Sequence, residues 1–350
     1  MMSFYDGTKL LSMRDINGNV PELYIVTTNR SAGKTTWFNR YLVKKFINEG
    51  EKFCLIYRYN YELDGVEDTF FKDIGNLFFP DYYMISKKQS RGAYSNLYLV
   101  DKSGTPIECG YAIALNSADI LKRRSHLLSD TKRMLFDEFQ SETNRYCPNE
   151  IIKFQSVHKS IARGNGKQSR YVPVFMLGNN VSLLNPYYVA FGFANILNKN
   201  TKFLRGNGVV IEQGFNESAF KAQQESVFNR AFKDSNYQQY SNQGIYLNDN
   251  LAFIEKMNGV NDYLVTLKYE GQEYAIREYY NDGVVYCDDS VDKTFPNKVT
   301  VSTADHDINY VMLRKSSDLI SLLRYYFDRG VFRFKNLQCK DAVLAMLSYK

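Results

Sequence analysis

The sequence lacks paired cysteines, a leader-like N-terminus and long apolar runs. Its five cysteines stand singly, with no CxxC pair. This spacing excludes a sequence-readable zinc site and argues against a disulfide framework. The first residues, MMSFYDGTKLL, contain neither a basic n-region nor an apolar h-region, and the longest apolar runs are too short to span a bilayer. We therefore expect no signal peptide, no membrane segment and a reducing compartment.

A strong excess of one charge is also missing. Among 350 residues, 44 are Lys or Arg and 38 are Asp or Glu, so the net charge is +6. Such a mild excess permits a polyanionic partner without requiring one. Residues 241–310 carry 5 basic and 12 acidic side chains, whereas residues 311–350 carry 8 basic and 3 acidic ones. Each patch by itself is equally well explained as a solvated face. A hydrophobic content of 44% excludes a disordered chain, and the length favours two domains.

The first half of the chain alternates short apolar runs with helical periodicity. An apolar strand at 23–26 precedes the segment TTNRSAGKTT, after which an amphipathic helix stops at Gly50 and a second strand covers 53–57. Strand, loop, helix and strand in this order predict a βαβ unit of a parallel sheet. Further elements are expected as strands at Cys109–Leu115, Met134–Phe136 and Val174–Leu177, and as a helix at Glu150–Ala162.

The second half has a different texture. Residues 213–243 are polar, rich in Gln and Asn, and mostly helical in period. Beyond Gly244, apolar and polar residues alternate at 263–269, 273–279 and 284–287, and helical patterns at 317–327 and 340–349 close the chain. We therefore expect an α/β domain at residues 1–200, a helical connecting segment at residues 201–243 and a C-terminal α+β domain at residues 244–350.

Gly33-Lys34-Thr35 lies between a predicted strand and a predicted helix, as the end of a P-loop does. The glycine lets backbone N–H groups turn toward phosphate, the lysine reaches the β/γ oxygens, and the hydroxyl binds Mg²⁺ at the helix N-terminus. The full loop reads Thr28, Asn29, Arg30, Ser31, Ala32, Gly33, Lys34 and Thr35, followed by Thr36. Thr28 replaces the first glycine of the consensus. A GKT tripeptide also occurs by chance, but the surrounding strand and helix favour phosphate binding.

Asp137-Glu138 ends the predicted strand at 134–136. A P-loop ATPase needs one carboxylate for the Mg²⁺ water shell and another to polarise the attacking water. The carboxyl ends of parallel strands form the ligand edge of such a sheet, so the two adjacent acids supply both groups there. An isolated Asp-Glu pair is usually solvated surface. Together with the P-loop, this pair favours ATP hydrolysis.

Two further polar residues fit the same chemistry. Asn179 follows the strand at 174–177, where a polar side chain senses the γ-phosphate, although a turn former is the alternative. Arg163 ends a predicted helix before Gly164-Asn165-Gly166, which suits an arginine finger reaching into a neighbouring subunit. Arg145 and Arg170 are the competing candidates for that role.

These motifs, in this order, resemble the DNA-packaging ATPases (encapsidation proteins) of phi29-like small tailed bacteriophages, which are related to large terminases. In the terminase loop the first glycine is often lost and an arginine precedes GKT, which accounts for Thr28 and makes Arg30 a candidate nucleotide-sensing residue. The resemblance covers about residues 20–190, whereas the C-terminal part is similar only in size and texture. The other matching segments are 56–59 with 62–63, 110–115, 117–122, 136–139, and 177–182 with 185–187.

The resemblance implies a P-loop NTPase of the additional-strand, catalytic-glutamate type, working with ATP and Mg²⁺. It implies a homo-oligomeric ring, similar to a pentamer, that docks on the portal of an empty procapsid and drives double-stranded DNA inward. It further implies a packaging RNA as a partner, as in some members of that family. Such a motor works in the host cytoplasm, transiently at the portal vertex, and is absent from the mature virion. In this scheme Lys34 and Thr35 bind Mg²⁺ and ATP, Asp137 orders the metal, Glu138 activates water, Arg163 acts in trans, and Asn179 reports the γ-phosphate.

The C-terminal domain, by resemblance, is a ribonuclease H-type fold that has lost its cutting residues. Four acids, Asp282, Asp288, Asp289 and Asp292, cluster on one hairpin, whereas two-metal nucleases use acids that converge on paired ions. We therefore expect solvated turn acids and no nuclease activity. The basic tail suits RNA or portal docking through Arg314, Lys315, Arg324, Arg329, Arg333 and Lys335.

A DNA translocase must contact phosphates rather than base edges, because it handles any sequence. Lys122-Arg123-Arg124 is the candidate contact in the first domain. Two alternatives stay open. A helicase- or partition-type DNA-dependent ATPase has the same P-loop and needs no portal, and a nucleotide-switch module binds nucleotide without sustained turnover.

Overall fold

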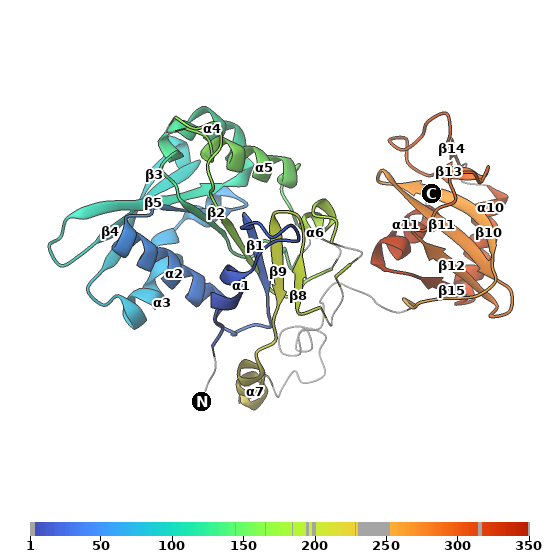
Figure 1. Ribbon diagram of the computed structural model, residues 1–350, viewed down its shortest axis with the longest axis horizontal. Coiled ribbons are helices and arrows are strands. Elements are labelled where there is room, and N and C mark those ends of the chain that lie inside the picture. The colour runs from blue at the N-terminus through green and yellow to red at the C-terminus, as the bar shows by residue number, and fades with distance from the viewer. Residues whose placement is uncertain are drawn as a thin grey trace. The chain divides into compact units, whose positions relative to one another are not determined.

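The computed structural model describes residues 4–143, 145–164, 166–183, 185–193, 196–197, 201–227, 229, 253–313 and 317–348. The described chain divides into two compact units, one containing β1 to β9 and the other β10 to β15 (Figure 1). Within the described ranges, no helix is both long and apolar enough to cross a membrane.

The strands of the first unit are β1 (Leu23–Thr27), β2 (Phe53–Tyr57), β3 (Tyr83–Gln89), β4 (Tyr94–Val100), β5 (Pro106–Ala114), β6 (Arg133–Phe136), β7 (Val174–Gly178), β8 (Phe203–Arg205) and β9 (Val209–Gln213). Its α-helices are α1 (Thr8–Ser12), α2 (Lys34–Glu49), α3 (Val66–Phe78), α4 (Ala118–Arg123), α5 (Glu150–Ile161), α6 (Pro186–Ala190) and α7 (Glu217–Glu225). Short 3₁₀ turns are η1 (Asn60–Leu63), η2 (Ser90–Gly92), η3 (Leu115–Ser117) and η4 (Ser125–Leu128).

The described strands of this unit form one nine-stranded sheet in the order β3-β4-β5-β2-β6-β7-β1-β9-β8. The six strands from β5 to β9 in this order are parallel, and antiparallel strands flank them on both sides. β7 lies between the strand that leads into the P-loop, β1, and the strand that leads into Asp137, β6. This inserted strand confirms the expected additional-strand P-loop architecture.

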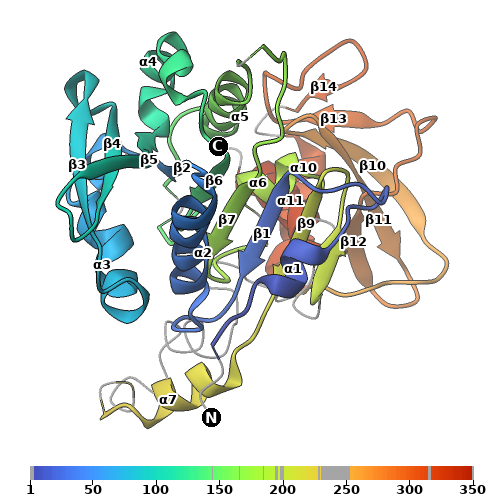
Figure 2. The same cartoon turned by 60° about the vertical axis from the view of Figure 1, so that its left-hand side comes forward.

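Helices cover both faces of this sheet (Figure 2). On one face, Phe38 of α2 and Phe70 of α3 pack in a continuous buried cluster with side chains of β1, β2, β6 and β7. On the other, Phe154 of α5 and Tyr187 of α6 pack against Phe136 of β6. Alternate residues of a strand point to opposite faces, so helices bury both sides of the central strands. The loops at the strand ends are left to carry the site.

The register brings those strand ends to one level. Thr27 at the end of β1 pairs with Gly178 at the end of β7, and Phe136 at the end of β6 pairs with Met176. The loops that follow β1, β6 and β7 therefore leave the sheet side by side, at its carboxyl edge. This is the edge at which open α/β sheets bind ligands.

The boundary expected at residue 200 is wrong. β9 pairs with β1 along its whole length, and β8 pairs with β9, so residues 203–213 belong to the first sheet rather than to a connecting segment. The sequence 209–213 is short, and its backbone pairing depends on a distant strand. Helix α7 lies in the range expected to be helical. Residues 230–243 lie outside the described residues.

The second unit contains β10 (Asp262–Tyr269), β11 (Gln272–Tyr279), β12 (Val284–Asp288), β13 (Lys298–Thr300), β14 (Val311–Met312), α10 (Asp318–Asp328), β15 (Phe332–Phe334) and α11 (Leu337–Ser348). Its described strands have the order β14-β13-β10-β11-β12-β15. The antiparallel meander β10-β11-β12, with β13 parallel to β10 and β14 parallel to β13, agrees with the expected ribonuclease H-type sheet. Leu323 of α10 and Met346 of α11 pack on its buried side chains.

The acids of this unit differ from the expected solvated turn. Asp288 is buried and pairs with Arg277 at 2.8 Å, and Asp289 pairs with Lys335. The prediction that both are solvated is therefore wrong, because side chains from β11 and from the segment after β15 reach the end of β12. Asp292 accepts hydrogen bonds from Thr294. Across the described ranges, no group of three or more His, Cys, Asp or Glu side chains is placed to hold a metal ion.

The expected docking tail is partly engaged inside its own unit. Arg324 donates to the carbonyl of Leu347 at 2.8 Å, and Arg333 pairs with Glu255 at 2.6 Å. Arg314 and Lys315 lie outside the described residues. A docking role for this tail stays a prediction.

Candidate active site

The loop between β1 and α2 has the backbone that a phosphate loop requires. Ser31 and Gly33 have positive φ angles of 62° and 93°, whereas Thr28 does not adopt this conformation. The consensus glycine is thus not needed at Thr28. Its methyl group packs against the backbone at Gly214, where an added Cβ would lie 3.2 Å from it. Its hydroxyl donates to the Asn29 carbonyl at 2.9 Å.

Helix α2 opens directly from this loop. Gly33 is its N-cap and supplies no side-chain hydrogen bond, so the first N–H groups of the helix have no side-chain cap at this position. The helix has 16 residues, and its dipole places partial positive charge at this end. An uncapped helix start following a loop with left-handed residues is suited to bind an anion.

Lys34 joins the P-loop to the end of β7. Its side chain is largely enclosed, with 8% of the residue exposed, and its Nζ donates to Asn179 Oδ1 at 2.7 Å. Burial lowers the pKa of Lys34, and the nearby charges of Asp137 and Glu138 oppose that shift. The structure therefore brings together four predicted site residues, from the ends of β1, β6 and β7.

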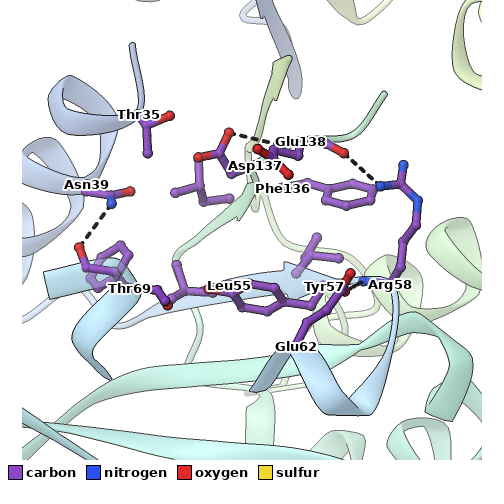
Figure 3. Close-up of a pocket in the computed structure, with 13 residues that line it drawn as sticks. Thr35, Asn39, Leu55, Tyr57, Arg58, Glu62, Thr69, Phe136, Asp137 and Glu138 are labelled. Carbon is purple, nitrogen blue, oxygen red and sulfur yellow. Dashed lines mark hydrogen bonds between the residues drawn. The ribbon is translucent and has the colours of Figure 1, made fainter. Parts of the chain in front are cut away.

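Asp137 and Glu138 follow β6 and face the start of α2. Figure 3 shows the Asp137 carboxylate turned toward the side of the cavity where Thr35 lies. Surrounding protein raises the pKa of Asp137, while the Lys34 ammonium and a hydrogen bond from Thr35 lower it. The pKa of Glu138 is raised by burial first, and then by the charges of Asp137 and Glu142. A carboxyl with a raised pKa, held at a cleft, is typical of a general base.

Glu138 lines two adjoining cavities, of about 270 Å³ and 360 Å³. The first is lined by Thr35, Asn39, Leu55, Ile56, Tyr57, Arg58, Glu62, Thr69, Phe70, Leu135, Phe136, Asp137 and Glu138. The second is lined by Arg30, Arg58, Tyr59, Tyr61, Glu62, Glu138, Gln140, Ser141, Glu142, Thr143, Arg145 and Asn179. Glu138 therefore lies between the cavity that contains Thr35 and the cavity that contains Asn179.

A third cavity, of about 530 Å³, lies at the outer side of the P-loop. Its walls combine residues 31–36 with the aromatic rings of Phe4, Trp37 and Phe78. The N-terminal segment reaches this place because Tyr5 N–H donates to the Ala32 carbonyl at 2.8 Å. Sequence reasoning did not find this segment, since nothing in it marks a contact with a loop that folds later in the chain.

The candidate arginines occupy different positions. Arg30 forms an ion pair with Glu142, which follows Asp137 and Glu138 in the chain. Arg145 lines the polar cavity beside Glu138. Arg170 donates to the carbonyl groups of Ile161 and Thr131, so it stabilises the turn after α5. Arg163 is exposed in that turn and lines none of the three cavities described above.

The sequence did not predict two further contacts of the site, made by Asn216 and Arg58. Asn216, the N-cap of α7, exchanges hydrogen bonds with Asn29 of the P-loop, with its N–H 2.8 Å from Asn29 Oδ1. Arg58 follows β2 and donates to the Glu138 carbonyl at 2.7 Å. Polar residues that follow parallel strands meet at one edge of the sheet, and Arg58 follows such a strand, so this rule could have placed Arg58 at the site. Asn216 gave only a helix-cap signal.

Comparison with known proteins identifies the family of this chain. The family model described as podovirus DNA encapsidation protein (Gp16) matches residues 2–349. The DNA packaging protein of Bacillus phage phi29 is 26% identical over 337 residues, covering 95% of this chain and 93% of the relative. That of Bacillus phage B103 is 24% identical over 320 residues, covering 90% and 92%.

Solved structures show the same fold. A chain of the bacteriophage Phi-29 viral genome packaging motor assembly superposes with a TM-score of 0.71 and 25% identity, covering 99% of this chain and 98% of that chain. A chain of the Phi-28 gp11 DNA packaging motor gives a TM-score of 0.53 at 16% identity, covering 100% and 99%, which shows the fold alone. The family model spans nearly the whole sequence. The chain therefore belongs to the podovirus DNA encapsidation protein (Gp16) family.

Proposed function

We propose that this chain is an ATP-hydrolysing motor that translocates viral double-stranded DNA into a preformed procapsid. The observation that carries this proposal is the convergence of Lys34, Asp137, Glu138 and Asn179 at one sheet edge, beside the uncapped start of α2. Phosphoryl transfer needs positioning and charge stabilisation more than covalent chemistry. A P-loop lysine, paired acids and a polar sensor provide those functions.

The residues at this edge fit a magnesium–triphosphate. Thr35 and Asp137 offer a hydroxyl and a carboxylate, which are hard oxygen ligands, and the protein supplies no complete cage among the described residues. Mg²⁺ usually retains waters and binds through one or two protein oxygens together with substrate phosphates. Bound Mg²⁺ would neutralise charge on the phosphate oxygens. Thr35 and Asp137 would hold it, while residues 28–36 hold the phosphates.

Glu138 is the proposed general base. Its carboxylate borders both cavities beside the P-loop, and the raised pKa strengthens it as a proton acceptor. Asn179 already accepts a hydrogen bond from Lys34. It is placed to exchange that bond when a γ-phosphate competes for the same ammonium, which is the proposed sensing step. Arg30, which pairs with Glu142, is the second proposed sensor.

The ring and its partners extend the proposal. Relatives are named as DNA packaging proteins, and the similar solved chain is part of a packaging motor assembly. We accordingly propose that the chain forms a homo-oligomeric ring, a pentamer, at the portal vertex in the host cytoplasm. A packaging RNA contact, absence from the mature virion and DNA contacts by Lys122, Arg123 and Arg124 belong to the same proposal.

ATPase turnover tests the chemistry. Lys34→Ala should abolish turnover through lost nucleotide binding, and Glu138→Gln should retain ATP binding while losing about 10²- to 10⁴-fold in kcat. Lys44→Ala is the matched control, because Lys44 is exposed on the same helix. Unchanged turnover in Glu138→Gln would remove Glu138 from the mechanism. Turnover absent from the wild type, despite bound ATP, would favour the nucleotide switch.

Ring function needs separate measurements. Arg163→Ala mixed with wild type should inhibit assembled rings more than the mixing ratio predicts, whereas activity proportional to the wild-type fraction would contradict action in trans. Packaging of DNA into purified empty procapsids, with and without added RNA, distinguishes a packaging motor from a helicase- or partition-type ATPase. DNA-stimulated turnover without any packaging would favour the latter.

A further inference from the structure

The backbone at Glu138 has an unusual conformation. Its φ angle is +54°, in the left-handed region that a residue with a side chain rarely adopts. Such a conformation persists only where surrounding groups hold it. Because φ and ψ at this residue set the direction of its side chain, whatever holds this kink also sets where the Glu138 carboxylate points.

Arg58 holds the main chain on both sides of the kink. Its Nη1 donates to the Glu138 carbonyl at 2.7 Å, and its Nη2 donates to the Phe139 carbonyl. Figure 3 shows the guanidinium of Arg58 reaching across the cavity from the end of β2 to this backbone. Two carbonyl groups at successive residues are thus fixed by one planar group, which restricts rotation about the Glu138 backbone.

The carboxylate of Glu150 in turn holds the guanidinium of Arg58. Its Nε lies 3.0 and 3.1 Å from the two carboxylate oxygens of Glu150. Glu150 is 3% exposed, and it also accepts from the Tyr187 hydroxyl and from the Cys147 N–H, each at 2.8 Å. A buried carboxylate with several donors has little freedom to move. Helices α5 and α6 therefore fix Arg58 through Glu150.

Two aromatic rings also pack against the guanidinium of Arg58. The guanidinium carbon lies 5.2 Å from the centre of the Phe136 ring and 5.0 Å from that of Tyr146. Arginine suits this place because its rigid planar group donates in several fixed directions and stacks on rings. A lysine at this position would keep the charge and lose the simultaneous bonds to Glu150 and both carbonyl groups.

We propose that Arg58 is a positioning residue for Glu138: it transmits the rigid arrangement of Glu150 and Tyr187 to the backbone that aims the general base. The proposal rests on the proposed ATPase function. It assigns Arg58 no contact with nucleotide and no proton transfer. Its effect on the reaction passes through the direction of one carboxylate.

The first test compares Arg58→Lys with wild type in steady-state ATPase and nucleotide-binding assays. A displaced base slows chemistry and leaves binding intact, so kcat should fall by about 10- to 100-fold with the Kd for ATP unchanged. Arg133→Lys is the matched control, because Arg133 pairs with Glu51 and contacts Tyr41 at the opposite end of β6. Weaker ATP binding by Arg58→Lys would instead indicate direct contact with phosphate and overturn the proposal.

A double-mutant cycle separates positioning from general support of the fold. In a Glu138→Gln background no base remains to be aimed, so adding Arg58→Lys should cause no further loss of single-turnover rate. Losses that multiply would overturn the proposal. Tyr187→Phe is the second variant, in case Arg58→Lys folds poorly, because it removes only the hydroxyl that donates to Glu150. We expect a smaller loss of kcat in Tyr187→Phe than in Arg58→Lys. A wild-type kcat in Tyr187→Phe would contradict the proposed transmission.

The outcomes also distinguish this proposal from the function on which it rests. If wild type hydrolyses ATP and Glu138→Gln does not, the function holds, and Arg58→Lys alone decides the positioning role. If Glu138→Gln retains wild-type turnover, the assignment of Glu138 fails first. Activity of the Arg58→Lys variant equal to wild type, beside an inactive Glu138→Gln variant, overturns only the positioning role.

Discussion

Replacing Asn179 with alanine removes the acceptor of the enclosed Lys34 ammonium. The lost bond is short, at 2.7 Å, and charge-assisted, and Lys34 is only 8% exposed, so water replaces the amide poorly. A hydrogen bond to a charged group contributes about 1.5–3 kcal/mol. For a unit of this size, each kcal/mol shifts Tm by about 2–4 °C, so we expect Asn179→Ala to lower Tm by about 3–12 °C.

Nucleotide should reverse part of this loss. Phosphate oxygens would offer Lys34 new acceptors, so a non-hydrolysable ATP analogue with Mg²⁺ should narrow the Tm difference between variant and wild type. Differential scanning fluorimetry with and without the analogue measures both effects. Asn185→Ala is the control: it removes the N-cap of α6, should cost about 1 kcal/mol, and should show the same deficit with and without nucleotide.

Two results would refute this reasoning. An unchanged Tm in nucleotide-free Asn179→Ala would show that the Lys34–Asn179 bond contributes nothing to folding. A deficit that stays constant at saturating analogue would show that the lysine does not exchange its amide acceptor for phosphate. The second result would also remove the proposed sensing step, even if ATP still binds.

Three further predictions address charge and packing. Glu142→Gln removes a charge that raises the pKa of Glu138, so the acid limb of kcat/KM should move to lower pH; an unmoved limb would contradict this coupling. Burial raises the pKa of Asp137 in the folded protein. The protonated carboxyl therefore stabilises the fold at pH values below the pKa of the unfolded chain, and this contribution is lost as the pH rises through the pKa of the folded protein. Asp137→Asn should therefore raise Tm near pH 7 and lose this gain in acid; a lower Tm near pH 7 would contradict it. Gly110→Ala places a Cβ 2.1 Å from the Phe53 carbonyl oxygen, so urea unfolding should show a loss of about 1–3 kcal/mol or more. Wild-type stability would mean that β5 and β2 do not pair in this register.

The sequence predicted the central elements well because their signals are local. The strand at 53–57 and the helix that stops before Gly50 agree with β2 and α2, and Gly50 adopts the left-handed C-cap conformation. The strand after Pro173 begins at Val174 as expected, because proline cannot donate a ladder hydrogen bond. Hydrophobic periodicity and the glycine and proline residues that bound helices and strands act within a few residues, so these signals can be recognised without knowing the fold.

Long-range pairing was the source of the errors. Residues 203–213 read as part of a connecting segment, but their strands complete the sheet by pairing with β1. The sequence predicted Asp288 and Asp289 to be solvated turn acids, but in the structure they form ion pairs with Arg277 and Lys335. Both outcomes depend on which distant backbone or charge lies alongside, and that is set by packing of the whole unit.

The sequence by itself determined the chemistry of the site: a Gly-Lys-Thr turn at a helix start, two adjacent acids and an asparagine, each after an apolar strand. These assignments need only local conformation and the rule that parallel strands end at one edge. The tertiary structure decided how the groups are held. Arg58, Glu150 and Tyr187 come from distant segments, and only folding places their donors and acceptors within hydrogen-bonding distance of one another and of the Glu138 backbone.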